Sequence, residues 1–325
     1  MVDDMMRTDL TVSNIAENAQ AMVEEIERVI VGKRATVKRA VMTLLCNGHL
    51  LIEDIPGVGK TTLAKALSKT IGGEFRRVQF TPDLLPADIT GSSVFNQRTS
   101  EFEFRPGPIF GNVVLVDEIN RATPKTQSSL LEAMEERQVT TDGETRPLPK
   151  PFFVIATQNA VEMTGTYPLP EAQLDRFFAR ISLGYPEIAD EIEILREQQG
   201  SHPIDLTRRI VDLEALMAMQ SGVRSVFVSD SVREYMVAIV RATRESNQLL
   251  MGASPRGSLH LMRASQAHAA IDGADFVRPD DVKAVAASVL AHRCLPRAEL
   301  RAKGQTTDEV ILRLLDVVPA PVPVG

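Results

Sequence analysis

The chain has 325 residues, which is long for one average domain and sufficient for two. Its composition is that of an ordinary globular protein, with 44% hydrophobic and 24% charged residues. The formal net charge of −7 gives no overall basic field to attract a nucleic acid, although a ring could still have a basic lining.

Targeting and redox features are sparse. Residues 1–10 carry three aspartates and no apolar core, so no signal peptide is expected, and no run reaches the roughly 20 apolar residues of a membrane helix. Cys46 and Cys294 have neither metal-ligand nor redox-motif spacing, so we expect them to be reduced core residues. We therefore expect a cytoplasmic protein without a membrane segment, with a disordered tail over residues 318–325.

The first half of the chain alternates between strand and helix patterns. Residues 14–30 are predicted to form a helix, because Asn14 and Glu17 have capping-box spacing and apolar side chains recur on one face. The alternation predicts an α/β fold, a parallel sheet flanked by helices. The expected segments are a helix over 38–45, a buried strand over 50–52, a helix that ends at Gly72-Gly73, a strand over 78–80, a buried strand over 109–116, a helix that begins at Thr123-Pro124 and a buried strand over 152–157.

The second half has a different pattern. A two-residue hairpin is predicted at Asp142-Gly143, between two short β-favouring segments. After about Pro186 only helical segments are expected, over residues 190–199, 232–243, 255–270 and 279–292. The sequence therefore predicts an α/β domain over residues 1–190 and a small all-helical lid domain over residues 191–317.

A glycine-rich segment, Gly57-Val58-Gly59-Lys60-Thr61, lies where a predicted strand meets a predicted helix. Glycine lets backbone N–H groups approach a phosphate chain, and the N-terminus of a helix favours its negative charge. Lys60 would contact the β- and γ-phosphates, and Thr61 would place its hydroxyl on Mg²⁺. The usual phosphate loop begins with a glycine where this chain has Asp54, so the short motif alone is not decisive.

Two carboxylates, Asp117 and Glu118, directly follow the apolar run Val113-Val114-Leu115-Val116. Asp117 is suited to order Mg²⁺ through its water shell, and Glu118 to act as the general base that polarises the attacking water. A single Asp-Glu pair is often only a solvated strand end. Because this pair follows a phosphate loop and ends a second buried strand, the sequence predicts hydrolysis of a Mg-nucleotide.

Three further polar residues are candidates for the same chemistry. Asn159 follows the strand over 152–157 and could hold the lytic water, although asparagine after a strand is usually a turn residue. Arg176 closes a loop near the end of the α/β domain, and Arg256 lies in the first turn of a helix. Such arginines usually form surface ion pairs, yet phosphoryl transfer benefits from an arginine of the same or another chain. The five histidines show no metal-ligand spacing.

These motifs, in this order, resemble the MoxR family of AAA+ ATPases over most of residues 10–300. The resemblance rests on residues 53–61, 116–122, 124–127, 131–136, 156–159, 165–177 and 254–256. The family tolerates an acidic residue at the position of Asp54, so this departure does not count against nucleotide binding.

The resemblance implies roles for individual residues. Asn159 corresponds to sensor 1, Arg176 to an arginine finger that acts on the neighbour's nucleotide, and Arg256 to sensor 2. The family belongs to the helix-2-insert group, which places the insert in residues 82–107 and the pre-sensor-1 hairpin at about 139–151. The residues implied to bind the cofactors ATP and Mg²⁺ are Val31 and Gly32 for adenine, Pro56, Gly57, Val58, Gly59, Lys60, Thr61, Thr62 and Asp117 for the nucleotide, and Thr61 and Asp117 for the metal.

The resemblance also implies partners. A homo-oligomeric ring is expected, with six subunits, acting on a client protein in chaperone-like maturation or assembly. Family clients are often metalloenzymes, and a partner with a von Willebrand factor A (VWA) domain is common. Three alternatives stay open: a nucleic-acid motor, disfavoured by Asp142 and Glu144 in the hairpin; a metal-chelatase ATPase subunit of the same group; and a slow ATP-gated binding switch.

Overall fold

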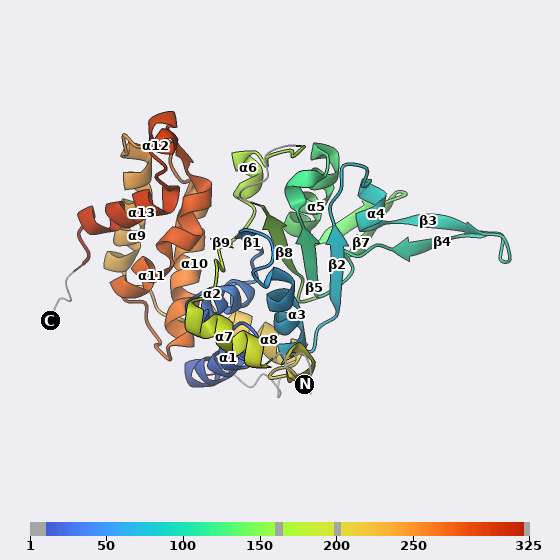
Figure 1. Cartoon of the computed structure of the whole chain (residues 1–325), viewed down its shortest axis with the longest axis horizontal. Coiled ribbons are helices and arrows are strands. Elements are labelled where there is room, and N and C mark those ends of the chain that lie inside the picture. The colour runs from blue at the N-terminus through green and yellow to red at the C-terminus, as the bar shows by residue number, and fades with distance from the viewer. Residues whose placement is uncertain (1–10, 160–164, 198–202, 322–325) are drawn as a thin grey trace, which may run out of the picture.

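The protein is described by a computed structural model that covers residues 11–159, 165–197 and 203–321. Its centre is a five-stranded sheet of order β2-β5-β8-β1-β9 in which every neighbouring pair is parallel (Figure 1). The strands are β1 Leu50–Glu53, β2 Phe75–Gln79, β5 Val113–Asp117, β8 Phe153–Gln158 and β9 Ala179–Ile181. The predicted α/β fold is confirmed, although the edge strand β9 was not predicted and β5 begins four residues later than expected.

Alternate side chains of the central strands enter two separate apolar clusters. In β5, Val113 and Leu115 join one cluster, while Val114 and Val116 join the other. This alternation is the period of two of a strand with both faces covered. The first face is covered by α1 Val12–Glu27, α2 Arg34–Leu45 and α3 Lys60–Thr70, and the second by α4 Pro86–Thr90 and α5 Pro124–Glu136.

Helix α1 begins differently from the prediction. Its N-cap is Thr11, whose hydroxyl accepts a hydrogen bond from the backbone N–H of Asn14 at 3.4 Å. The predicted cap at Asn14 is therefore wrong, because Asn14 already lies inside the first turn. The helix also ends at Glu27, three residues before the predicted end.

Two antiparallel hairpins project from the α/β part. The first pairs β3 Gly91–Asn96 with β4 Glu101–Pro106 and forms the long ribbon seen in Figure 1. The second pairs β6 Gln138–Thr141 with β7 Glu144–Pro147. Its turn residues Asp142 and Gly143 have φ values of 56° and 80°, as a two-residue turn of type I′ requires.

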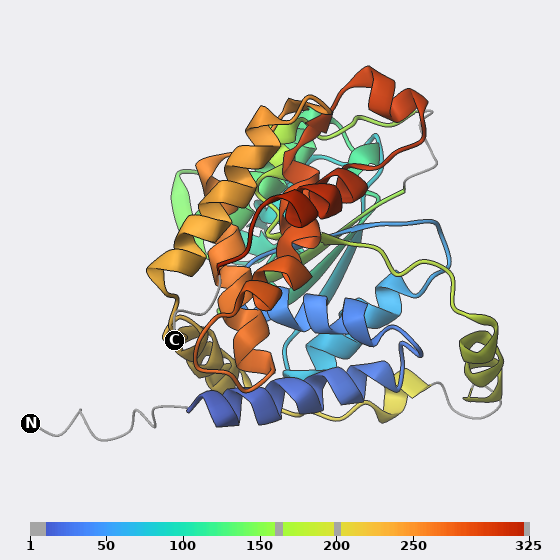
Figure 2. The same cartoon turned by 90° about the vertical axis from the view of Figure 1, so that its left-hand side faces the viewer.

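The C-terminal part is a helical lid, as predicted. Figure 2 shows its helices in front of the sheet, with α1 lying below them. It also contains a short antiparallel pair, β10 Leu249–Met251 with β11 Leu295–Pro296, which the sequence did not indicate. The remaining segments are α6 Glu171–Leu174, α7 Ile188–Glu197, α8 Leu213–Val223, α9 Asp230–Glu245, α10 Pro255–Ile271, α11 Pro279–Leu290, α12 Ala298–Ala302, α13 Thr307–Val317 and the 3-10 turns Ile119–Arg121, Pro203–Leu206 and Ala291–Arg293.

Lid and sheet are in close contact. The apolar cluster beneath α1–α3 continues without a break into α10 and α11, through residues such as Leu261 and Val285. Helix α1 packs against both α3 and α10. No helix in the described part of the chain is long and apolar enough to cross a membrane.

Candidate nucleotide-binding site

The glycine-rich segment forms a loop between the end of β1 and the start of α3. Gly57 and Gly59 have φ values of 85° and 92°, which residues with a side chain rarely adopt. A Cβ built at Gly57 would meet no atom within 4 Å, so the backbone of the loop faces open space. The exposed backbone and the helix N-terminus behind it are suited to cradle a phosphate chain.

Lys60, the first residue of α3, folds over this loop. Its Nζ donates hydrogen bonds to the backbone carbonyls of Asp54 (3.0 Å) and Ile55 (3.1 Å). Burial lowers the pKa of Lys60, and the nearby carboxylates of Asp54, Asp117 and Glu118 oppose this shift. Strand β8 pairs in parallel with both β1 and β5, so the loop that follows β1 and the carboxylates that end β5 lie at the same end of the sheet and belong to one site.

Asp117 is held at the end of β5 by two donors. Its Oδ2 accepts from Arg77 Nε at 2.7 Å, and its Oδ1 accepts from the Thr157 hydroxyl at 3.3 Å. The side chain is only 10% exposed. A buried carboxylate with a fixed orientation at this edge of the sheet is suited to bind a hard cation such as Mg²⁺ together with the Thr61 hydroxyl.

Glu118 is held by a different set of partners. Its backbone has a φ of 54°, and its N–H donates to the Thr157 hydroxyl oxygen at 2.9 Å. Its Oε2 accepts from Gln79 Nε2 and from Arg121, each at 2.9 Å. The positive φ and these hydrogen bonds fix the orientation of the carboxylate.

Four of these partners were missed by sequence reasoning: Arg77, Gln79, Arg121 and Thr157. Gln79 is the last residue of β2 and pairs with Asp117 in the register of β2 and β5. Because strand order was not predictable, this neighbourhood could not be inferred. Thr157 stood in a segment already singled out, and a hydroxyl at the tip of a buried strand was a signal for it.

A cavity of about 220 Å³ adjoins the phosphate loop. Its lining includes Val31, Gly57, Gly59 and Thr62, together with Gly184 and Pro186. Gly32 turns the chain at its edge with a φ of 72°, where a Cβ would lie 1.9 Å from Asp190. Pro56 is exposed at the tip of the loop and does not line the cavity.

Asn159 lies at the same edge of the sheet. It follows β8 directly, and the last residue of β8, Gln158, is in register with Glu53 at the end of β1. The structure therefore places Asn159 next to the start of the phosphate loop.

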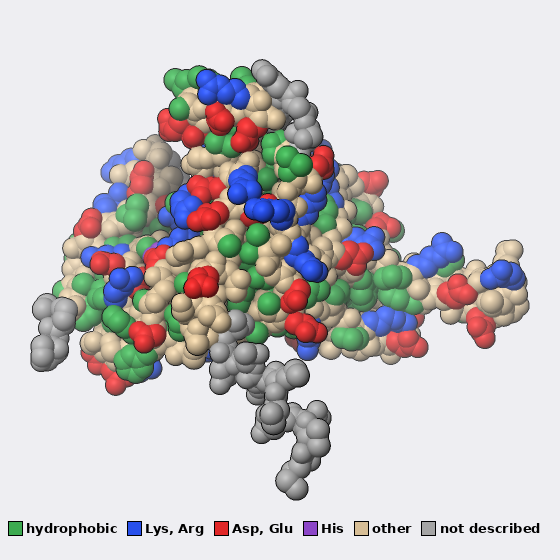
Figure 3. All heavy atoms as spheres, turned by 90° about the horizontal axis from the view of Figure 1, so that it is seen from below, with side chains coloured by type: hydrophobic (Ala, Val, Ile, Leu, Met, Phe, Trp, Pro, Cys, Tyr) green, Lys and Arg blue, Asp and Glu red, His purple; other side chains and the backbone are tan. Residues whose placement is uncertain are grey.

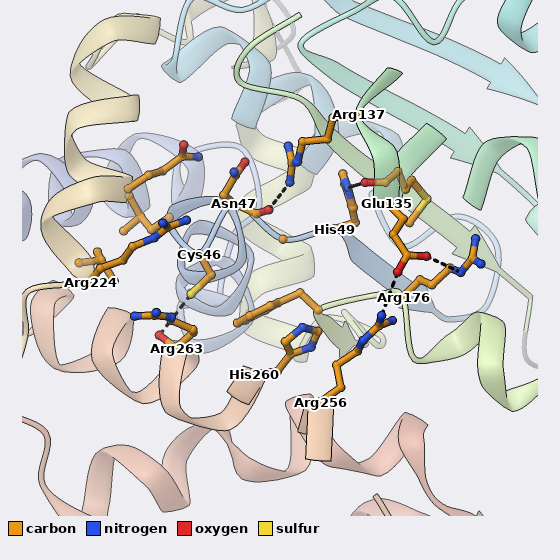
Figure 4. A pocket seen from close by; sticks show the side chains of 16 residues that line it. Cys46, Asn47, His49, Glu135, Arg137, Arg176, Arg224, Arg256, His260 and Arg263 are labelled. Carbon is orange, nitrogen blue, oxygen red and sulfur yellow. Dashed lines mark hydrogen bonds and ion pairs between the residues drawn. The ribbon is translucent and has the colours of Figure 1, made fainter. Parts of the chain in front are cut away.

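The two candidate arginines lie together in a different cavity, of about 340 Å³ (Figure 4). Arg256 donates to Glu135 at 2.9 Å, and Arg176 forms an ion pair with the same carboxylate at 3.4 Å. Arg256 also lies 3.8 Å from Asp175. None of the phosphate-loop residues 56–62 lines this cavity.

The arginine cavity is rich in positive charge. Arg137, Arg224 and Arg263 also line it, while Glu135 is its only acidic lining residue in the described part of the chain. Arg137 is committed to the backbone carbonyls of Asn47 and Phe152, to which it donates hydrogen bonds. The cavity is thus suited to an anion rather than to an apolar ligand.

The sheet order, the glycine loop between β1 and α3, the carboxylates that end β5 and the helical lid define an AAA+ P-loop ATPase. Residues 49–179 match the ATPase family associated with various cellular activities (AAA), and residues 241–314 match the AAA lid domain.

Relatives narrow this class to a family. The chain is 50% identical to the uncharacterised protein YeaC of Bacillus subtilis, over 92% of this chain and 94% of that protein. It is 42% identical to Chaperone MoxR1 of Mycobacterium tuberculosis (91% and 81% covered) and 30% identical to Protein MoxR of Methylorubrum extorquens (96% and 98%). A crystal structure of a candidate ATPase from Cytophaga hutchinsonii superposes with a TM-score of 0.89 at 37% identity, covering 96% of this chain and 97% of that one. The chain belongs to the MoxR family of AAA+ ATPases.

Proposed function

We propose that the chain binds ATP with Mg²⁺ and hydrolyses it in a homo-oligomeric ring, for which six subunits are expected. One observation carries this proposal. The phosphate loop with Lys60 lies at the same end of the sheet as Asp117 and Glu118, whereas Arg176 and Arg256 gather in a separate cavity of the same chain. A complete hydrolytic site then needs two chains.

Within one chain, the loop backbone and Lys60 hold the phosphates. The Thr61 hydroxyl and Asp117 hold Mg²⁺, which neutralises charge on the phosphate oxygens when bound. Glu118 acts as the general base, and Asn159 positions the attacking water. The adenine of ATP is bound in the cavity beside Val31 and Gly32.

The arginines act on the neighbour. The arginine cavity is not lined by residues 56–62, which favours a role for its guanidinium groups outside the phosphate loop of their own chain. Arg176 and Arg256 would contact the nucleotide of an adjacent subunit and neutralise charge that develops on its phosphates. A dilute, separate chain should therefore hydrolyse ATP slowly.

The work done by this cycle is the remodelling of a partner protein. The name of the mycobacterial relative, Chaperone MoxR1, supports this role. We place the α/β domain at residues 1–190 and the lid at residues 191–317, so that a nucleotide contacted by two subunits can shift one domain against the other. The client is a protein or complex under assembly, with a metalloenzyme and a VWA-domain partner as the expected cases.

A nucleic-acid motor is less well supported. Figure 3 shows acidic and basic side chains interspersed on the face it presents and along the projecting ribbon β3–β4. In that ribbon Glu101 and Glu103 lie between Arg98 and Arg105, which gives no continuous basic track for a phosphate backbone.

The test is the ATPase rate per chain against protein concentration, for wild type, Glu118→Gln, Arg176→Ala and an equimolar mixture of the two variants. We expect the wild-type rate to rise with concentration, each variant alone to be inactive, and the mixture to regain activity. A rate that is independent of concentration, with Arg176→Ala fully active, would show a self-contained nucleotide switch instead.

A further inference from the structure

Asp54 is a buried carboxylate at the position where a phosphate loop usually has its first glycine. The residue is 5% exposed. Its Oδ1 accepts from the backbone N–H of Ile55 at 2.9 Å. Its Oδ2 accepts from three donors, the N–H groups of Leu183 (2.5 Å) and Gly184 (2.9 Å) and the hydroxyl of Ser182 (3.1 Å).

These hydrogen bonds join two parts of the chain that meet at one edge of the sheet. Asp54 directly follows β1, and Ser182 directly follows β9, the parallel neighbour of β1. Both segments then line the 220 Å³ cavity, one through Gly57 and Gly59 and the other through Gly184 and Pro186. The carboxylate therefore links the start of the phosphate loop to the wall of the cavity that Gly184 and Pro186 form.

The link is specific to an ionised carboxylate. Among the described residues, no Lys or Arg forms an ion pair with Asp54, so its charge is balanced by four N–H and O–H donors together with the nearby Lys60 amine. An amide at this position could accept with only one oxygen, and its NH₂ group would face backbone N–H donors. A glycine would leave the donors of residues 182–184 without this acceptor, at a cost typical of unpaired buried groups.

We propose that Asp54 is a positioning residue that sets the separation between the phosphate loop and the Gly184 wall, and thereby the affinity for the nucleotide. It does not contact the reacting atoms, which lie on the side of Asp117 and Glu118. The Lys60 amine, which donates to the backbone carbonyl of Asp54, is oriented by the same anchored residue. This inference rests on the proposed nucleotide function of the cavity.

The test compares Asp54→Asn with two other variants in the binding of a fluorescent ATP analogue with Mg²⁺ to the full-length chain. We expect Asp54→Asn to raise the Kd about 10- to 100-fold, the range expected for losing hydrogen bonds to a charged group. In the assembled enzyme the loss should appear in KM, with kcat within about twofold of wild type, because Glu118 and its partners are unchanged. Ser182→Ala removes one of the four donors and should raise the Kd about two- to fivefold.

Asp212→Asn is the matched control. Asp212 caps α8 by accepting from the N–H of Ala215 at 2.8 Å, so the variant makes the same change from carboxylate to amide at a residue that does not line the cavity. It should leave both the melting temperature and the Kd close to wild type, because asparagine caps a helix about as well as aspartate. The stabilisation that the ATP analogue gives in a thermal melt should fall in Asp54→Asn and be retained in Asp212→Asn.

Two results separate the possible failures. If Asp54→Asn and Ser182→Ala bind the analogue as wild type does, while Lys60→Ala does not bind it, the positioning role is wrong and the nucleotide site stands. If Lys60→Ala itself binds the analogue normally, the nucleotide function of the cavity is wrong. Should Asp54→Asn not fold, the Kd of Ser182→Ala decides, and an unchanged value overturns the inference.

Discussion

The two cavities of this chain are built in opposite ways. In the phosphate-loop site the carboxylate of Asp117 accepts from two fixed donors, and its side chain is 10% exposed. In the arginine cavity the charged groups are cations that share a carboxylate, Glu135, which is 40% exposed. One site is preorganised within the chain, whereas the other keeps its cations within reach of solvent.

The charge balance of the arginine cluster shows the same difference. Arg293 is buried and forms an ion pair with Asp175 at 2.8 Å, which leaves Glu135 as the main partner of both Arg176 and Arg256. Three guanidinium groups thus share two carboxylates, which leaves these five groups with a net positive charge. The cavity is therefore electropositive in the separate chain, which suits it to contact an anion bound to a second chain.

The largest expected effect is the loss of Arg176. Arg176→Ala should lower the ATPase rate of the assembled protein about 10³- to 10⁵-fold, the range known for arginines that stabilise phosphoryl transfer. Phosphate release measures the rate, and titration of the separate chain with the fluorescent ATP analogue should give the wild-type Kd. Arg241→Ala, which removes an exposed arginine paired with Glu245, is the control and should be active. A weakened Kd in Arg176→Ala would place the arginine in its own chain's site and end the comparison drawn above.

Glu118→Gln should have the next largest effect. A glutamine keeps the size of the side chain and its contacts with Gln79 and Arg121 but cannot take a proton, so turnover should fall about 10²- to 10⁴-fold. Nucleotide binding should persist, because the carboxylate is not part of the cavity lining. Rapid-quench measurement of product in a single turnover checks this, with Glu132→Gln, an exposed site on α5, as the control. Wild-type turnover would remove Glu118 from the role of base.

More of the phosphate-loop site than of the arginine cavity could be predicted from the sequence. Lys60, Asp117 and Asn159 belong to local motifs on consecutive segments, so their gathering follows once the strands are parallel. The Glu135 bridge depends on how the lid sits on the sheet, and the position of Gln79 beside Glu118 depends on strand order. Neither arrangement has a local signature, and β9 was missed because a three-residue edge strand has no periodicity to detect.

Two histidines of the arginine cavity should make stability depend on pH. Burial and Arg137 lower the pKa of His49 to about 3, and burial with Arg293 and Arg256 lowers that of His260 to about 3. His49 also accepts from the Val154 N–H through Nδ1, which a proton there would prevent. Above the ordinary pKa of 6.5, both histidines are neutral in the folded and in the unfolded chain, so their contribution to the free energy of unfolding is fully present there. It is lost as the pH falls from 6.5 towards 3, because only the unfolded chain then binds the protons.

The measurement is urea unfolding between pH 7 and pH 5.5, above the range in which most carboxylates titrate. Each histidine should contribute a loss of at most about 1.4 kcal/mol per pH unit below its ordinary pKa. His260→Gln should reduce the slope of the free energy of unfolding against pH by the contribution of one histidine. An unchanged slope would mean that His260 is protonated in the folded chain, which would add further positive charge to the cavity.

The smallest expected effect, on Glu135, tests the comparison most directly. If the neighbour's phosphate takes the place of this carboxylate on Arg176 and Arg256, Glu135→Gln removes a competitor and should lower the protein concentration for half-maximal ATPase activity. The shift should be only about two- to fivefold, because ion pairs this exposed are screened by solvent. Glu136→Gln, the adjacent exposed carboxylate, has no ion pair among the described residues and should match wild type. A higher half-maximal concentration in Glu135→Gln would show that the carboxylate preorganises both arginines for the neighbour, so that the two cavities would be built on the same principle after all.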